Sequence, residues 1–71
     1  MNADTGRELL ANRTDWVLVE RQTGMILRGL PRWEVARTVG DTVAAIESEL
    51  FARLAWESPR WIVVGEWRRK S

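Results

Sequence analysis

Five tryptophans stand in a chain of 71 residues that has neither cysteine nor histidine. At this length a single hydrophobic core supplies only about 3–5 kcal/mol, and many small domains add a disulfide or a bound metal. Without cysteine, neither a disulfide nor a thiolate metal site can form. The tryptophans must take over that role, because each indole can bury about 150–250 Å² of surface. The composition therefore predicts one small domain built around these rings.

The missing histidine also constrains function, because histidine is the commonest general base and a frequent metal ligand. Zinc chemistry and triad hydrolysis are therefore disfavoured. An enzyme would have to rely on carboxylates, arginines and hydroxyls, in a chain too short to enclose a deep pocket. No glycine-rich phosphate loop is present, and the carboxylates show no spacing typical of a glycosidase or a metal site. We expect a protein that is not an enzyme and that takes no cofactor and no metal.

Residues 1–14 lack a sustained apolar period and predict a flexible N-terminal segment. Leu9 and Leu10 are its apolar pair, and two arrangements stay open for them: packing back onto the domain, or ordering on a partner. The segment carries acids where a signal peptide needs an apolar stretch, and no run approaches membrane-spanning length. We expect a cytoplasmic protein that makes no contact with a membrane.

Residues 15–68 predict a single α+β domain, which starts with a hairpin in "DWVLVERQTGMILRGL". Gly24 supplies the positive backbone dihedral that its short turn requires. Apolar residues on both faces of the first strand indicate a central position in the sheet. A short helix follows over residues 31–40, because Pro31 and Gly40 stand where helix boundaries favour them.

A second helix is predicted from Asp41, its expected N-cap, to Ser58 and Pro59, which would end it. Its apolar stripe contains Val43, Ile46, Leu50 and Leu54. The run "WIVVGEW" predicts the last strand, and residues 69–71 form a basic tail. The expected fold is a small two-layer α+β domain of order β-β-α-α-β, with a three-stranded antiparallel or mixed sheet covered by two helices, and we expect a monomer.

Charge is segregated along the chain although the net charge is only +1. Residues 41–58 carry one arginine against four acids, whereas residues 59–71 carry four cations against one acid. Such a division is expected of a protein that docks on a mixed protein surface, since nucleic-acid binders usually carry a larger positive excess.

A weak nucleic-acid contact is an alternative, because arginine beside tryptophan can stack on bases and bind phosphates. The basic end, joined by Arg28, Arg32 and Arg60, would form that surface, although short basic tails also serve solubility alone. A helix-turn-helix over residues 33–50 is disfavoured by the acids in its second helix, which would face phosphate. An antitoxin-like interaction module of the HicB kind is a third alternative, and it would require residues 33–39 to form a strand.

The polar start "MNADTGRELLANRTDW", the tryptophan-rich strands and the arginine-rich end together resemble the small phage-encoded regulators of host RNA polymerase, the transcription inhibitors and antiterminators of lytic Xanthomonas phages. The resemblance is one of overall character and includes no short motif. It implies a protein of the host bacterial cytoplasm that binds the β and β′ subunits of bacterial RNA polymerase, displaces the σ factor and promotes antitermination. From the residues themselves, we expect two groups to contact the partner: Arg7, Leu9, Leu10 and Arg13 in the first segment, and Trp67, Arg68, Arg69 and Lys70 at the end.

Overall fold

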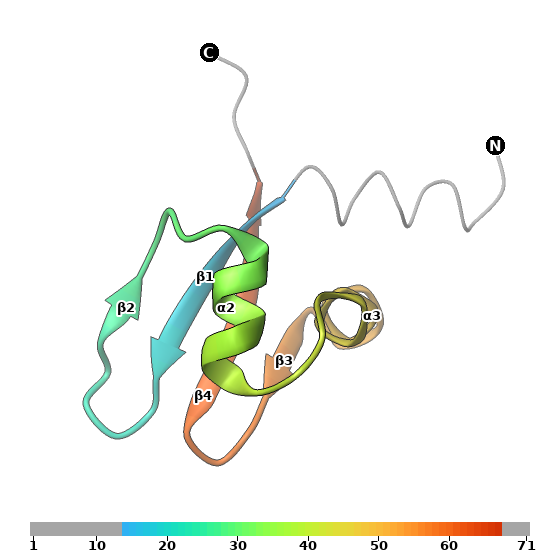
Figure 1. Cartoon of the computed structure of the whole chain (residues 1–71). Coiled ribbons are helices and arrows are strands. Elements are labelled where there is room, and N and C mark those ends of the chain that lie inside the picture. Colours follow the sequence, from blue (N-terminus) through green and yellow to red (C-terminus); the bar gives the residue numbers. More distant parts are fainter. Residues whose placement is uncertain (1–13, 68–71) are drawn as a thin grey trace, which may run out of the picture.

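Residues 14–67, the part of the chain that the computed structural model describes, form two helices packed on one face of a four-stranded antiparallel sheet (Figure 1). The elements follow the order β1 (Thr14–Glu20), β2 (Ile26–Leu27), α2 (Arg32–Val39), α3 (Val43–Arg53), β3 (Ala55–Glu57) and β4 (Trp61–Trp67). In the sheet the strand order is β2-β1-β4-β3. The expected α+β class, the two helices and the antiparallel arrangement are confirmed, and the expected number of strands is wrong by one.

The hairpin of β1 and β2 forms where the alternating apolar pattern predicts it. Leu18 stands opposite Leu27, and Val19 stands opposite Ile26. Gly24 adopts φ +74° in the turn, and its N–H donates to the carbonyl of Glu20 at 2.8 Å. Strand β1 also pairs along its whole length with β4, so its predicted central position is confirmed.

Helix α2 begins directly after Pro31 and ends at Gly40, as expected. Pro31 is the N-cap with φ −62°, and Gly40 takes the left-handed conformation with φ +81° while its N–H donates to the carbonyl of Ala36 at 2.9 Å. A glycine suits this position because a side chain would be strained there. The strand that an HicB-like arrangement requires over residues 33–39 is not formed.

Helix α3 differs from its prediction at both ends. Thr42 is the N-cap, since its Oγ1 accepts the N–H of Ala45 at 3.1 Å, whereas Asp41 accepts the N–H of Thr42. The helix ends at Arg53, well before Ser58, because Leu54 turns into the left-handed region at φ +66°. Leu54 is 75% exposed and does not continue the apolar stripe.

The early end of α3 frees residues for the unpredicted fourth strand. Strand β3 pairs with β4, with Trp56 opposite Val63. Trp56 is only 9% exposed. The reversal at Leu54 therefore carries a large apolar side chain into the core, and burial of that ring favours a strand over a longer helix.

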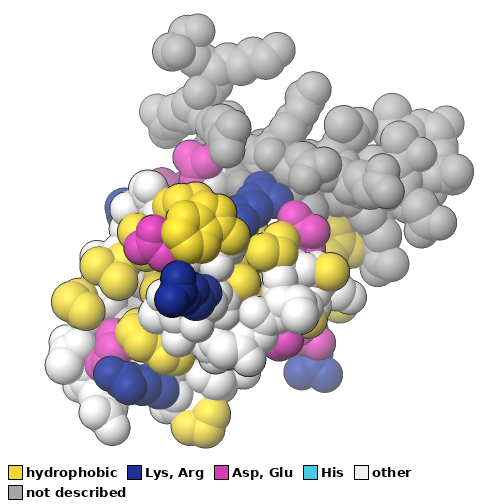
Figure 2. All heavy atoms as spheres, in the orientation of Figure 1, with side chains coloured by type: hydrophobic (Ala, Val, Ile, Leu, Met, Phe, Trp, Pro, Cys, Tyr) yellow, Lys and Arg dark blue, Asp and Glu magenta, His cyan; other side chains and the backbone are white. Residues whose placement is uncertain are grey.

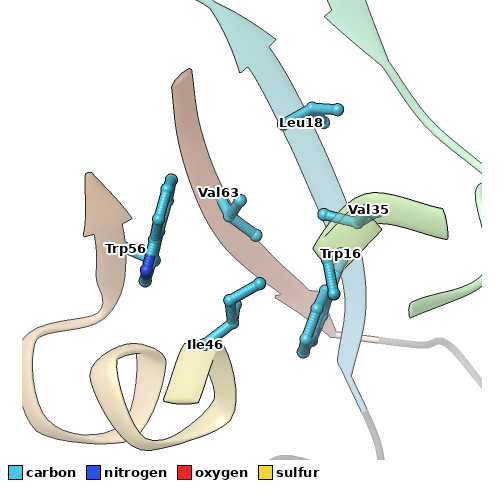
Figure 3. Packing of buried hydrophobic residues seen from close by; sticks show 7 residues of the cluster. Trp16, Leu18, Val35, Ile46, Trp56 and Val63 are labelled. Atoms are coloured by element: carbon cyan, nitrogen blue, oxygen red, sulfur yellow. The ribbon is translucent and has the colours of Figure 1, made fainter. Parts of the chain in front are cut away.

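The core lies between the sheet and the helices, and Figure 3 shows side chains from both layers pointing toward one another. Its buried members come from β1, β3 and β4 and from the inner faces of both helices: Trp16, Leu18, Val35, Ala36, Ile46, Trp56 and Val63. Trp61 packs against this cluster, as expected for a last strand whose tryptophan faces the helices. Tryptophans thus supply much of the buried surface of a small core.

Candidate interaction surfaces

Helix α2 carries an exposed tryptophan on the side that faces away from the core. Val35 and Ala36 are buried, whereas Trp33 is 59% exposed. Arg37 lies one turn after Trp33 on the same side, and it forms no ion pair with another described residue. Figure 2 shows hydrophobic and basic side chains next to one another over α2. We call Trp33 and Arg37 the α2 surface.

The arginines proposed for nucleic-acid contact are paired with carboxylates. Arg28 pairs with Glu66, and Arg32 with Glu47 at 2.7 Å. Arg60 lies 3.3 Å from Glu20. These pairs place a carboxylate beside each charge that a phosphate would have to meet, so Arg28, Arg32 and Arg60 do not form an unpaired basic patch.

Two of these arginines also cover tryptophan rings. The guanidinium carbon of Arg32 lies 5.1 Å from the centroid of Trp16, and that of Arg60 lies 5.1 Å from the centroid of Trp61. Such cation–π contacts occupy ring faces on which bases could otherwise stack. Arg32 and Trp16 therefore serve the fold, although the sequence pattern also suits nucleic-acid binding.

A buried carboxylate fixes the turn between β1 and β2. Glu20 is 5% exposed, and its Oε1 accepts the N–H of Thr23 at 2.8 Å and the Thr23 hydroxyl at 3.0 Å. The backbone N–H of Thr23 is the main cause that lowers the pKa of Glu20 below its usual 4.5; burial opposes this, and Arg60 adds to it. This cluster is structural, since its oxygens are already occupied.

An open groove runs between α3 and the edge strand β3. Asp41 contributes to its wall, and its Oδ2 accepts the indole N–H of Trp56 at 3.0 Å. Arg53 lies 3.6 Å from Glu49, its neighbour along the helix. The lining residues come from the turn before α3, from α3 and from β3: Asp41, Ala45, Ser48, Glu49, Arg53, Ala55, Trp56 and Glu57. The groove is therefore mainly polar and acidic.

The contact residues expected from the sequence lie outside this description. Arg7, Leu9, Leu10, Arg13, Arg68, Arg69 and Lys70 are beyond residues 14–67, as are residues 1–13 of the predicted flexible segment and the whole predicted basic tail, residues 69–71. Trp67 ends β4, and its side chain also lies outside the described residues. Their role in binding stays a prediction.

The α2 surface could have been found from the sequence, because Trp33 and Arg37 lie one turn apart and Val35 lies on the opposite side of a helical wheel. The groove could not have been found from the sequence, because strand β3 forms one of its walls and was not predicted.

Among residues 14–67, no three or more carboxylates are grouped so that they could hold a metal ion. No helix in that range is both long enough and apolar enough to cross a membrane. Comparison with known protein families, with curated proteins and with solved structures found no match.

Proposed function

We propose that the protein acts by binding a protein partner and does not catalyse a reaction. The observation that carries this proposal is the α2 surface, where Trp33 is 59% exposed beside an arginine that has no ion-pair partner among the described residues. Tryptophan and arginine are the residue types most enriched among those that dominate binding energy at protein interfaces. The exposed Trp33 ring contributes little hydrophobic free energy to folding. A partner that covers the ring would gain the free energy of burying it.

The partner that we propose is bacterial RNA polymerase, through its β and β′ subunits, with σ displacement and antitermination as the consequences. This choice rests on the resemblance to phage-encoded regulators of the polymerase. The segregated charge supports it, because an acidic middle and a basic end suit a large surface of mixed charge. The α2 surface then adds a contact to those predicted in residues 1–14 and 67–70.

The first test is binding of the labelled full-length chain to core RNA polymerase and to the σ-containing holoenzyme. We expect saturable submicromolar binding to core and weaker binding to holoenzyme, because σ would compete for the site. No binding to the polymerase of a compatible host would refute the proposed partner. Binding to RNA or DNA alone, with an affinity that falls steeply as salt rises, would favour the nucleic-acid alternative.

A matched pair of variants tests the α2 surface. Trp33→Ala should weaken binding to the partner by about tenfold or more, as expected when a central aromatic contact is removed. Ile26→Ala is the control, because Ile26 is 54% exposed and lies on β2, so its loss should change affinity less than about twofold. Equal affinities of Trp33→Ala and the wild-type chain would exclude the α2 surface from the interface.

A further inference from the structure

The edge of β3 that faces away from β4 pairs with no other strand of residues 14–67, and we call it the free edge. Strand β3 is the last strand of the sheet order, and β4 pairs with it on one side only. The N–H of Ser58 donates to the carbonyl of Trp61 at 2.9 Å. Hydrogen-bonded pairs alternate along antiparallel strands, so Trp56 bonds toward β4 while the N–H and C=O groups of Ala55 and Glu57 point to the free edge.

The groove lies beside this strand, since all three residues of β3 line it. Trp56 is one of its lining residues and is held in place by the hydrogen bond from its indole N–H to Asp41. Figure 3 shows the Trp56 ring attached to β3 on the side of the core. A strand added beside β3 would extend the sheet next to α3, with its backbone against Ala55 and Glu57.

The negative charge of the groove favours a basic segment as its ligand. Three carboxylates (Asp41, Glu49 and Glu57) and one guanidinium (Arg53) line it, which leaves a formal charge of −2. Asp41 and Glu57 form no ion pair with another described residue, and Arg53 already lies near Glu49. A second copy paired edge to edge would bring two such sets of carboxylates together, which is repulsive. A basic segment would instead place its positive side chains near the carboxylates of Glu49 on α3 and Glu57 on β3.

We infer that the groove between α3 and β3 binds an extended basic segment of a protein partner by strand addition. The segment donates to and accepts from the outward backbone groups of Ala55 and Glu57. Side chains alternate between the faces of an added strand, so its arginine or lysine side chains on one face point toward Glu49 of α3 and those on the other face toward Glu57. This contact lies on different elements from the α2 surface and does not depend on the identity of the partner proposed above.

The probe is a fluorescein-labelled hexapeptide of sequence RRVRRV, which presents arginine on both faces of an added strand, titrated against the full-length chain by fluorescence anisotropy. We expect saturable binding that weakens as salt rises, and no binding of the same peptide with glutamate in place of arginine. The double variant Glu49→Gln/Glu57→Gln should lose about tenfold in affinity. The matched control Glu34→Gln/Glu66→Gln removes the same charge outside the groove and should stay within about twofold of the wild type.

Amide hydrogen exchange separates strand addition from simple charge attraction. Peptide binding should slow the exchange of the Ala55 and Glu57 amides, and a peptide that is N-methylated at alternate positions should lose this effect. Failure of the arginine peptide to bind, or binding without protection of these two amides, would overturn the inference. The inference would also be overturned if sedimentation showed a concentration-dependent dimer and the dimer protected the Ala55 and Glu57 amides in the absence of peptide. Circular dichroism checks that each variant is folded.

Discussion

At the scale of single residues, the most constrained charged side chain among the described residues is Glu20. Its carboxylate is buried at the end of β1, yet it accepts two hydrogen bonds from Thr23 and lies beside Arg60. Burial alone would raise the pKa of a carboxyl, so the lowered pKa shows that the hydrogen bonds outweigh desolvation. A carboxylate with a pKa lowered on folding stabilises the folded state above its unfolded pKa, and this contribution is lost as pH falls through the folded pKa.

We predict that Glu20→Gln lowers the free energy of unfolding at pH 7, because glutamine keeps the shape but not the charge that Thr23 and Arg60 meet. The difference from the wild type should shrink as the pH falls below 4.5 and through the lowered pKa of the folded state. Urea unfolding at pH 7 and pH 3, followed by tryptophan fluorescence, measures it. Glu49→Gln is the control, since its ion pair is exposed and should matter little at either pH. A difference that stays constant with pH would contradict the assignment.

At the scale of secondary-structure elements, the junction of α3 and β3 carries the least favourable backbone conformation that we find in residues 14–67. Leu54 has φ +66°, and it is the non-glycine residue of that range with a positive φ. A left-handed conformation costs a residue with a side chain roughly 1–2 kcal/mol. Since Leu54 is 75% exposed, burial of its side chain offsets little of this cost.

Leu54→Gly should therefore stabilise the protein by about 0.5–1 kcal/mol, because glycine adopts this conformation freely but loses more chain entropy on folding. Thermal and urea unfolding measure the change. Leu54→Ala keeps the backbone cost and removes the exposed side chain, so it should leave the stability close to that of the wild type. Destabilisation by glycine would mean that Leu54 does more than end the helix.

At the scale of the whole molecule, the core is small and every buried side chain matters. Seven buried residues form the cluster, and four of its side chains, Leu18, Val35, Ile46 and Val63, are fully buried. Both helices cover one face of the sheet, and the opposite face carries Val17 and Val64, which pair across β1 and β4. The ion pair of Arg28 with Glu66 links the segment after β2 to β4 across the intervening β1.

Ile46→Ala should cost about 2–5 kcal/mol, because it removes a fully buried side chain and leaves a cavity. That cost is comparable with the about 3–5 kcal/mol that a core of this size supplies, so a large fraction of the variant should be unfolded at 25 °C. Ile26→Ala is the matched control, since Ile26 is 54% exposed and should change stability by only about 0.5 kcal/mol. Urea unfolding of both variants measures the difference, and equal stabilities would contradict the assigned core.

Local signals in the sequence determined most of the element order. Alternation defined the β1 hairpin and β4, Gly24 and Gly40 occupy positive φ where a turn and a helix end need it, and Pro31 marks the start of α2. These signals suffice because each depends on backbone geometry or on the periodicity of a single segment.

Only the tertiary structure decided where α3 ends, that Trp56 lies on a fourth strand, and which arginines are already paired. A three-residue strand has no period to detect, and Leu54 is an unfavourable residue for the conformation that ends the helix. Burial of Trp56 in one cluster with Val63 and Ile46 decides the outcome through contacts between separate elements. The groove beside β3 also depends on this packing. Without burial of Trp56 there would be no strand β3 to form one of its walls.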